Sequence, residues 1–542
     1  MAILERMGLK DRRRVTILLL LFLLALGIRL WFQGALPYPG IRDSYHLCSL
    51  AENLAQGEGF TVEYVWHDII RFEEIPHPDD WQPPLYVAVT AGLIGLGMDP
   101  LPAGKSVSVL SGAMLVVVIF LAGSWIFDEE TGIAAALIAA AYPPLLFYSS
   151  VPMTDMLFVL ISTIGIVLLI RNDPTTDRAW LALGVVAGLA YLTRPTGGIL
   201  LISAAGALLW SRGRSELKKS VRSLVILGGA FLLVASPWLV RNTIVLGSPT
   251  RTMAGMRLWT MNEGDMFDFD YAEPDPVGVI LSPRTWRATA SYIVRVTVAL
   301  LSITPFFGFA FAGLLIFLMN RKTGTFRKAS LSIYLVVFLF MYGFKRCGGL
   351  WVRDILPIIS LAPLFAALAL LLLSRYAEKE IHDFTFRPFG FGVPTISSRK
   401  ALVAATCIAC LLYGLGWGIQ FYEGRVTVEE RESPEHDYTM RLVSNWFEDN
   451  VTPETVVMTR HPWHINYYSD LRTVSAPSVG SRLEKIASEY NATILVVDNW
   501  FNWPEKRGEP YLPLLEGENV PGFRLLARWE EPTPAAIYAI EK

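Results

Sequence analysis

The 542-residue chain is 53% hydrophobic and only 18% charged, a composition that excludes a single soluble domain and indicates a polytopic membrane protein. The formal net charge of −2 at pH 7, with basic residues grouped in short loops, is not typical of a nucleic-acid-binding surface. We therefore expect the lipid bilayer, and no nucleic acid, to be among the partners of the chain.

The first apolar segment, residues 15–34, follows a basic cluster and lacks a small-residue cleavage site after it, so we interpret it as a retained anchor. Ten further apolar segments, of 15–25 residues, are candidate spans, since crossing a bilayer takes roughly 17–25 residues. They lie at 104–126, 131–148, 154–171, 179–193, 196–211, 222–241, 294–318, 329–344, 353–374 and 401–421. The sequence thus predicts about 11 transmembrane helices.

Residues 85–97 are also apolar, but at about 1.5 Å per residue they reach only about 20 Å, short of a membrane core of about 30 Å. We expect this segment to lie in the membrane interface. With that assignment, Lys and Arg gather in the loops on the side of the N-terminus, for example at Lys218, Lys219, Arg321 and Lys322. The positive-inside rule then predicts a plasma-membrane protein with a cytoplasmic N-terminus and an external C-terminus. Only the loop at Asp128-Glu129-Glu130 contradicts this pattern.

The first external loop, 35–84, carries Asp43 about ten residues past the first span, at the start of a stretch with apolar residues at helical spacing. A carboxylate at the membrane surface is a candidate general base for a substrate that arrives through the bilayer. The alternative is that Asp43 only caps the following helix, since Asp is a favoured N-cap residue. A second acidic residue, Asp155, begins a later span.

From about residue 422 the sequence predicts a small external α/β domain, 422–542, after a membrane domain, 1–421. We expect strands near 455–459, 493–498, 523–528 and 536–540, and helices at 437–449 and 481–490. Nothing in this part points to catalysis. His461 and His464 have a metal-compatible spacing, but Pro462 lies between them and no nearby Cys or third histidine completes a set, so metal binding there is not favoured.

The four cysteines are too few for a disulfide scaffold. Cys48 and Cys347 are both expected outside, and the sequence leaves open whether they form a bridge.

Six short motifs follow one another along the chain, each at an expected external helix end. They are Arg42-Asp43-Ser44-Tyr45, Trp81-Gln82-Pro83-Pro84-Leu85-Tyr86, Pro152-Met153-Thr154-Asp155, Leu192-Thr193-Arg194-Pro195, Pro237-Trp238-Leu239-Val240-Arg241-Asn242 and Val352-Arg353-Asp354-Ile355-Leu356-Pro357. In this order the chain resembles the GT-C superfamily of polyprenyl-phosphate-dependent membrane glycosyltransferases, in the branch of the protein O-mannosyltransferases and aminoarabinose transferases.

The resemblance implies transfer of a sugar from a polyprenyl-phosphate carrier to an acceptor hydroxyl of a protein, lipid or glycan, on the external face and with inversion. Asp43 would accept the acceptor proton, with Asp155 as a second catalytic carboxylate. Arg194, Arg241 and Arg353 would bind the phosphate, since guanidinium groups bind phosphate bidentately, although each could instead snorkel to the interface. The motif residues Gln82 and Tyr45 would contact the substrate.

No cofactor is certain from the sequence. Asp43 and Asp155 could share a divalent metal ion or act without one. The alternative function is a transporter or lipid flippase of cell-envelope precursors, for which an inverted repeat is expected and none is found.

Overall fold

The computed structural model describes residues 11–34, 42–66, 72, 74–171, 176–211, 216–250, 252–257, 259, 275–303, 306–344, 352–380, 434–477, 483–498 and 511–541. Helices dominate as far as residue 380. In chain order these are α2 (Arg12–Gly34), α3 (Arg42–Gln56), α4 (Pro84–Gly95), α5 (Pro100–Ile126), α6 (Glu129–Ala140), α7 (Pro143–Ser150), α8 (Thr154–Arg171), α9 (Asp177–Thr193), η1 (Pro195–Gly198), α10 (Ile199–Ser211), α11 (Leu217–Leu246), α12 (Met253–Arg257), α13 (Pro276–Leu281), α14 (Pro283–Ile303), α15 (Phe306–Met319), α16 (Thr325–Phe344), η4 (Val352–Ile355), α17 (Leu356–Ile359) and α18 (Ala362–Glu380).

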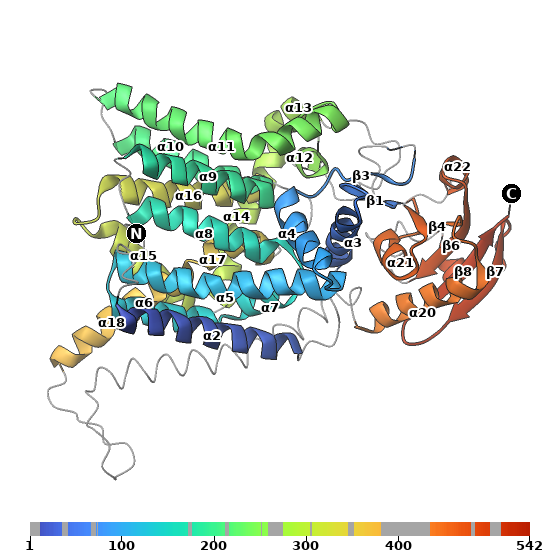
Figure 1. The fold of residues 1–542 in the computed structure, drawn as a ribbon, viewed down its shortest axis with the longest axis horizontal. Helices are drawn as coiled ribbons and strands as arrows, with labels where there is room; N and C mark the ends of the chain where they lie inside the picture. The colour runs from blue at the N-terminus through green and yellow to red at the C-terminus, as the bar shows by residue number, and fades with distance from the viewer. Residues whose placement is uncertain are drawn as a thin grey trace, which may run out of the picture.

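The long helices form a bundle in which α2, α5, α8, α9 and α11 follow one another side by side (Figure 1). Close helix approach depends on small residues, as is usual where lipid supplies no hydrophobic drive between helices. A Cβ atom at Gly123 of α5 would lie 2.6 Å from the Cα atom of Gly132 in α6. One at Gly184 of α9 would lie 2.4 Å from the carbonyl oxygen of Leu227 in α11. These contacts bring paired helices to backbone distance.

Within the described residues, four helices are long and apolar enough to cross a membrane: Arg12–Gly34, Pro100–Ile126, Lys218–Leu246 and Arg353–Tyr376. Shorter apolar helices lie at Pro84–Gly95, Thr154–Ile170, Pro195–Ser211 and Gly308–Met319. The chain is therefore a mostly helical membrane protein, but the predicted number of about 11 spans is not confirmed. The predicted span 401–421 lies outside the described residues, and the predicted span 294–318 falls on two helices, α14 and α15.

The predicted span 131–148 is broken into α6 and α7, which are bent by 56°. Pro143 begins α7 and cannot continue the hydrogen-bond ladder of α6. Arg29, fully buried in α2, donates from Nη1 to the carbonyl oxygen of Ala140 at 3.4 Å and from Nε to Ser149 Oγ at 3.1 Å. The buried guanidinium of Arg29 thus satisfies polar groups at the break. This contact was not predicted from the sequence.

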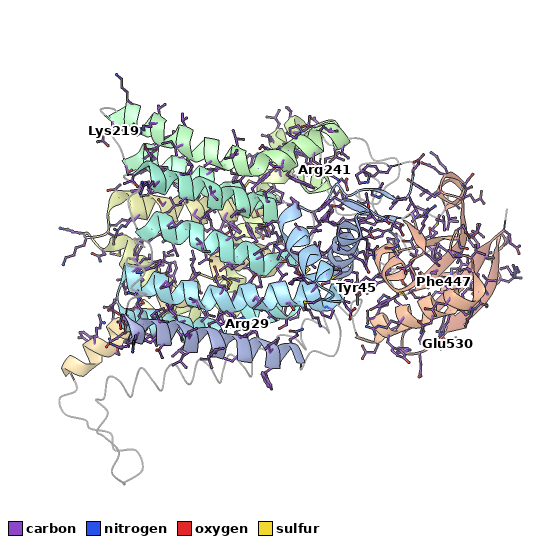
Figure 2. The ribbon with its side chains drawn as sticks, viewed as in Figure 1. Arg29, Tyr45, Lys219, Arg241, Phe447 and Glu530 are labelled. Carbon is purple, nitrogen blue, oxygen red and sulfur yellow. The ribbon has the colours of Figure 1, made fainter. Side chains whose placement is uncertain are left out.

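The acidic turn that contradicted the charge rule is neutralised by arginines at the same end of the bundle. Arg375 donates to Asp128 at 2.6 Å and to Glu130 at 3.4 Å, and Arg13 donates to Glu129 at 2.9 Å. The turn therefore adds little net charge there. Figure 2 shows Lys219 at this end and Arg241, on the same helix α11, toward the other end.

After residue 434 the described elements are α20 (Pro434–Asn450), β4 (Val456–Thr459), α21 (Pro462–Ser469), β5 (Arg472–Ser475), α22 (Leu483–Glu489), β6 (Ala492–Asp498), α23 (Leu512–Leu515), β7 (Phe523–Trp529) and β8 (Ala535–Ile540). They include all the strands and helices predicted for this part. Together with β2 they form a six-stranded sheet in the order β2-β5-β4-β6-β8-β7, which lies beyond one end of the bundle (Figure 1). The strands β2, β5, β4 and β6 are parallel, and β8 and β7 are antiparallel.

The edge strand β2 (Tyr64–Val65) comes from the first loop, where β1 (Thr61–Val62) and β3 (His77–Pro78) also pair with each other. Tyr64 stands opposite Thr473 of β5. The loop 35–84 and the C-terminal sheet are therefore joined by a shared sheet. The predicted boundary at 421/422 lies outside the described residues, so the division into two domains stays a prediction.

Candidate active site between the bundle and the C-terminal sheet

Asp43 forms an ion pair with Arg353. The helix α3 begins at Arg42, so Asp43 lies in its first turn, where the helix dipole favours a negative charge. Arg353, in η4, donates from Nη1 to Asp43 Oδ2 at 2.7 Å. The two side chains are 16% and 23% exposed, so solvent reaches a largely enclosed pair. Two residues 310 positions apart thus meet at the end of the bundle.

Asp155 and Arg194 form a second pair beside the first. Asp155 lies in the first turn of α8 and is only 1% exposed, and it accepts a hydrogen bond from Arg194 Nη1. Arg194 ends α9, and its Nη2 lies 3.9 Å from Asp354 Oδ1. Arg353 is attracted by Asp155 and Asp354 as well as by Asp43. The predicted residues Asp43, Asp155, Arg194 and Arg353 therefore form one charged network.

Each of these carboxylates is paired with a guanidinium, Asp43 with Arg353 and Asp155 with Arg194, and a divalent ion shared by Asp43 and Asp155 stays a prediction. Among the described side chains, the grouping of three ligand atoms that suits a metal ion lies elsewhere, at His436, His461 and Asp498.

Asp43 opens into a pocket with aromatic walls. The pocket is lined by Asp43, His46, Trp66, Trp81, Gln82 and Trp463. The rings of Trp66 and Trp81 are 4.6 Å apart between centroids, and Trp463 of α21 meets Trp66 edge-on at 5.7 Å. The pocket thus combines α3, the first loop and the C-terminal part. Gln82, which the sequence analysis named as a substrate contact, is among the lining residues, whereas the tryptophans were not predicted as site residues.

His46 lies three residues after Asp43 on the same face of α3, a spacing that could have identified it. Its Nε2 lies 3.2 Å from Asp79 Oδ1 and its Nδ1 lies 2.6 Å from the Tyr64 hydroxyl. Asp79 Oδ2 accepts backbone N–H bonds from Trp81 and Gln82, at 3.1 and 2.8 Å.

Burial would raise the pKa of Asp79, but His46 and the backbone N–H of Gln82 outweigh it, so the pKa lies below its ordinary value of 3.8. Asp79 is therefore ionised and holds both His46 and the turn that carries Trp81 and Gln82. It positions the pocket wall.

Tyr45 and Arg241 do not line the pocket. Tyr45, labelled in Figure 2, lies where the bundle meets the C-terminal part. It is fully buried, its hydroxyl donates to Asp437 of α20, and its ring lies 4.2 Å from that of His464 in α21. Arg241 lies over the rings of Trp238 and Phe60, at 4.8 and 5.5 Å, and donates to the Phe60 carbonyl oxygen at 3.4 Å. Both side chains tie the first loop and α3 to their surroundings.

The C-terminal part contains a buried cluster of histidines. His436 of α20 lies 4.6 Å from His461 and 6.0 Å from His464 between ring centroids, and His461 Nε2 lies 3.5 Å from Asp498 Oδ2. Burial, and then the neighbouring His464, lower the pKa of His436 to about 3, so its imidazole is neutral at physiological pH. The sequence-based view that His461 and His464 have no further ligand beside them was wrong, because the fold adds His436 and Asp498.

Comparisons with known proteins agree with the sequence motifs. Residues 81–240 match the family of dolichyl-phosphate-mannose-protein mannosyltransferases. No curated protein matches the chain in sequence.

The fold is similar to those of solved membrane transferases. The oligosaccharyltransferase AglB from Archaeoglobus fulgidus, solved with an inhibitory peptide and a dolichol-phosphate, is 13% identical with a TM-score of 0.58, over 98% of this chain and 75% of that one. ArnT from Cupriavidus metallidurans, solved with undecaprenyl phosphate, is 13% identical with a TM-score of 0.53, over 97% of both chains. A further structure of the Archaeoglobus fulgidus enzyme, with Zn and sulfate, is 13% identical with a TM-score of 0.54, over 97% and 73%.

The family match lies in the membrane region and includes the motifs of Gln82, Asp155 and Arg194. The shared fold extends over nearly the whole chain. The family match and the shared fold agree with the resemblance to GT-C glycosyltransferases that the sequence motifs carry.

Proposed function

We propose that the protein transfers a sugar from a polyprenyl-phosphate carrier to an acceptor hydroxyl, with inversion, on the face of the membrane that carries the first loop and the C-terminal sheet. The observation that carries this proposal is Asp43: a carboxylate in an aromatic pocket, paired with an arginine at the end of a helical bundle. A base and a phosphate-binding cation are what this reaction needs side by side.

In the reaction, the acceptor oxygen attacks the anomeric carbon and forms the new glycosidic bond. The bond between that carbon and the phosphate oxygen breaks, and the phosphate keeps the electron pair. Asp43 accepts the acceptor proton. Because the lipid-linked donor supplies both the sugar and the leaving group, no soluble nucleotide sugar or redox partner is required. Arg353 places a positive charge beside the carboxylate that takes this proton.

Arg353 and Arg194 are the residues that we assign to the phosphate. A guanidinium carries five N–H donors in a planar fork, so Arg353 can hold Asp43 and a phosphate oxygen at the same time. Arg194, 18% exposed, is held by the buried Asp155 and is oriented toward Asp354. An incoming phosphate would share these cations, and its growing charge would be stabilised in the transition state. Arg241 and Tyr45 keep a supporting role in this proposal.

The tryptophan walls suit the sugar. One face of a pyranose ring carries mainly C–H groups, which pack on the flat face of an aromatic side chain, while its hydroxyls need polar partners. Trp66, Trp81 and Trp463 offer the aromatic surface, and Gln82 and His46 offer polar atoms in the same pocket. Because Trp463 comes from α21, the pocket is complete only when the C-terminal part is docked on α3.

Labelled sugar donors test this function. Membranes that contain the protein are supplied with a panel of polyprenyl-phosphate sugars, each labelled in the sugar, and the label is followed. We expect one label to become covalently attached to an acceptor, and we expect Asp43→Asn membranes to lack this transfer. A transporter or flippase would instead move an intact labelled donor across the bilayer, in which case the label stays extractable as the starting lipid and the proposal fails.

A further inference from the structure

The histidine cluster of the C-terminal part has the geometry of a metal site. One ligand atom each from His436, His461 and Asp498 lie within 4.8 Å of one another, and the three residues are 3%, 0% and 0% exposed. They come from α20, from the residue before α21, and from the last residue of β6. Residues spread over more than sixty positions of the chain thus converge on one buried point.

We propose that His436, His461 and Asp498 bind a Zn²⁺ ion. Imidazole nitrogens and a carboxylate oxygen are ligands that Zn²⁺ takes at about 2.0–2.2 Å in a tetrahedral arrangement. Two ligands of such an ion stand about 3.3 Å apart. The separation of 3.5 Å between His461 Nε2 and Asp498 Oδ2 is close to this value. The ligand atoms of all three residues lie within 4.8 Å of one another, so binding of an ion would draw His436 closer.

The competing explanation is a metal-free buried pair, in which His461 donates directly to Asp498. An N–H···O bond has its donor and acceptor about 2.7–3.2 Å apart, so 3.5 Å is long for a direct bond between two fully buried groups. A shared ion explains the spacing better.

His464 stands beside the cluster but is not one of its three grouped ligands. Its ring centroid is 5.3 Å from that of His461 and 6.0 Å from that of His436. Burial of all three ligands closes the site to solvent, which favours a structural zinc over a catalytic one.

The ion would join α20, α21 and β6 into one unit. The helix α21 supplies Trp463 to the pocket, and its His464 ring packs against Tyr45 of α3. Loss of the ion would therefore loosen the part of the molecule that closes the pocket. The metal site itself does not depend on the proposed transferase activity.

Metal content of the purified full-length protein tests the proposal. The informative variant is His461→Gln, because glutamine keeps an N–H donor for Asp498 but is a poor Zn²⁺ ligand. The matched control is His77→Gln: His77 is also buried, but its ring contacts the backbone oxygens of Tyr64 and Pro78. We expect about one zinc per chain in the wild type and in the control, and at least about tenfold weaker zinc affinity in His461→Gln. A strong chelator should lower the melting temperature of the wild type and leave that of His461→Gln unchanged.

Absence of zinc from the wild type, together with no rise of its melting temperature on adding Zn²⁺, would overturn the proposal. Equal zinc content in His461→Gln would overturn it as well. If that variant aggregates, the metal-stripped wild type is titrated with Co²⁺. The visible absorption of tetrahedral Co²⁺, abolished by competing Zn²⁺, supports the site, and its absence contradicts it.

Discussion

The pair of Asp155 and Arg194 allows a quantitative test of the charged network. Asp155 is 1% exposed and Arg194 is 18% exposed, so Arg194→Gln leaves a buried carboxylate without its main counter-charge. Removing one partner of a buried pair costs about 3–5 kcal/mol. Because solvent reaches the guanidinium, we expect the lower end, about 3 kcal/mol of the free energy of unfolding.

The second variant, Asp155→Asn, removes the buried charge. Combined with Arg194→Gln it replaces the ion pair by two neutral amides of similar shape, and most of the stability should return. We expect a coupling free energy of about 1–3 kcal/mol between the two sites. Recovery should be incomplete, because Arg194 also lies 3.9 Å from Asp354.

The assay is the unfolding midpoint of each purified variant in the same detergent. Arg222→Gln is the control, since Arg222 pairs with Asp177 at the surface, where the side chains are 71% and 50% exposed and such a pair contributes about 0–1 kcal/mol. Two results would show that the network is not a coupled buried unit. One is that Arg194→Gln lowers the unfolding midpoint no more than Arg222→Gln; the other is that the effects of Arg194→Gln and Asp155→Asn on stability are additive.

Three further predictions concern the pocket, acid stability and topology. Trp463→Phe should raise KM for donor or acceptor by about 2–10-fold, which corresponds to the loss of an aromatic contact of about 0.5–1.5 kcal/mol. The control Trp446→Phe, outside the pocket, should leave KM unchanged. Equal KM values in both variants would remove Trp463 from the site. The folded pKa of Asp79 lies below 3.8, so its contribution to stability is present above about pH 4 and is lost as pH falls through the folded value. Asp79→Asn should therefore flatten the acid side of a plot of unfolding midpoint against pH. An unchanged acid side would contradict this. A cysteine at the exposed position Glu74 should react with an impermeant thiol reagent in intact cells, whereas one at the exposed position Lys218 should not, and labelling at Lys218 would reverse the predicted orientation.

Local signals predicted much of the fold. The strands β4, β6, β7 and β8 were predicted because each is a run of β-favouring residues between turns, and the start of α3 was predicted from apolar spacing after Asp43. The break between α6 and α7 was not predicted, although Pro143 is a local signal for it; Arg29, which satisfies polar groups at the break, lies more than a hundred positions away. The strand β2 has two residues, too few for any pattern to show.

The candidate site divides in the same way. Asp43, Asp155, Arg194 and Arg353 were predicted because short motifs carry them to helix ends, and the fold brings them together. Trp463 could not be predicted, because nothing local to α21 indicates that this helix docks on α3. The ligands of the proposed zinc site could not be predicted for the same reason. They are separated along the chain, and only the sheet topology places Asp498 beside His461.

The general-base role of Asp43 is the central claim, and the turnover of Asp43→Asn tests it most directly. Asparagine preserves the shape of the side chain and an oxygen that can accept from Arg353, but it cannot take the acceptor proton. General-base assistance contributes about 10²–10⁴-fold, so sugar transfer should fall by that order while the purified variant stays monodisperse and still binds the donor. Turnover near that of the wild type, with donor binding intact, would contradict the account and leave Asp43 a residue that serves only the structure of α3.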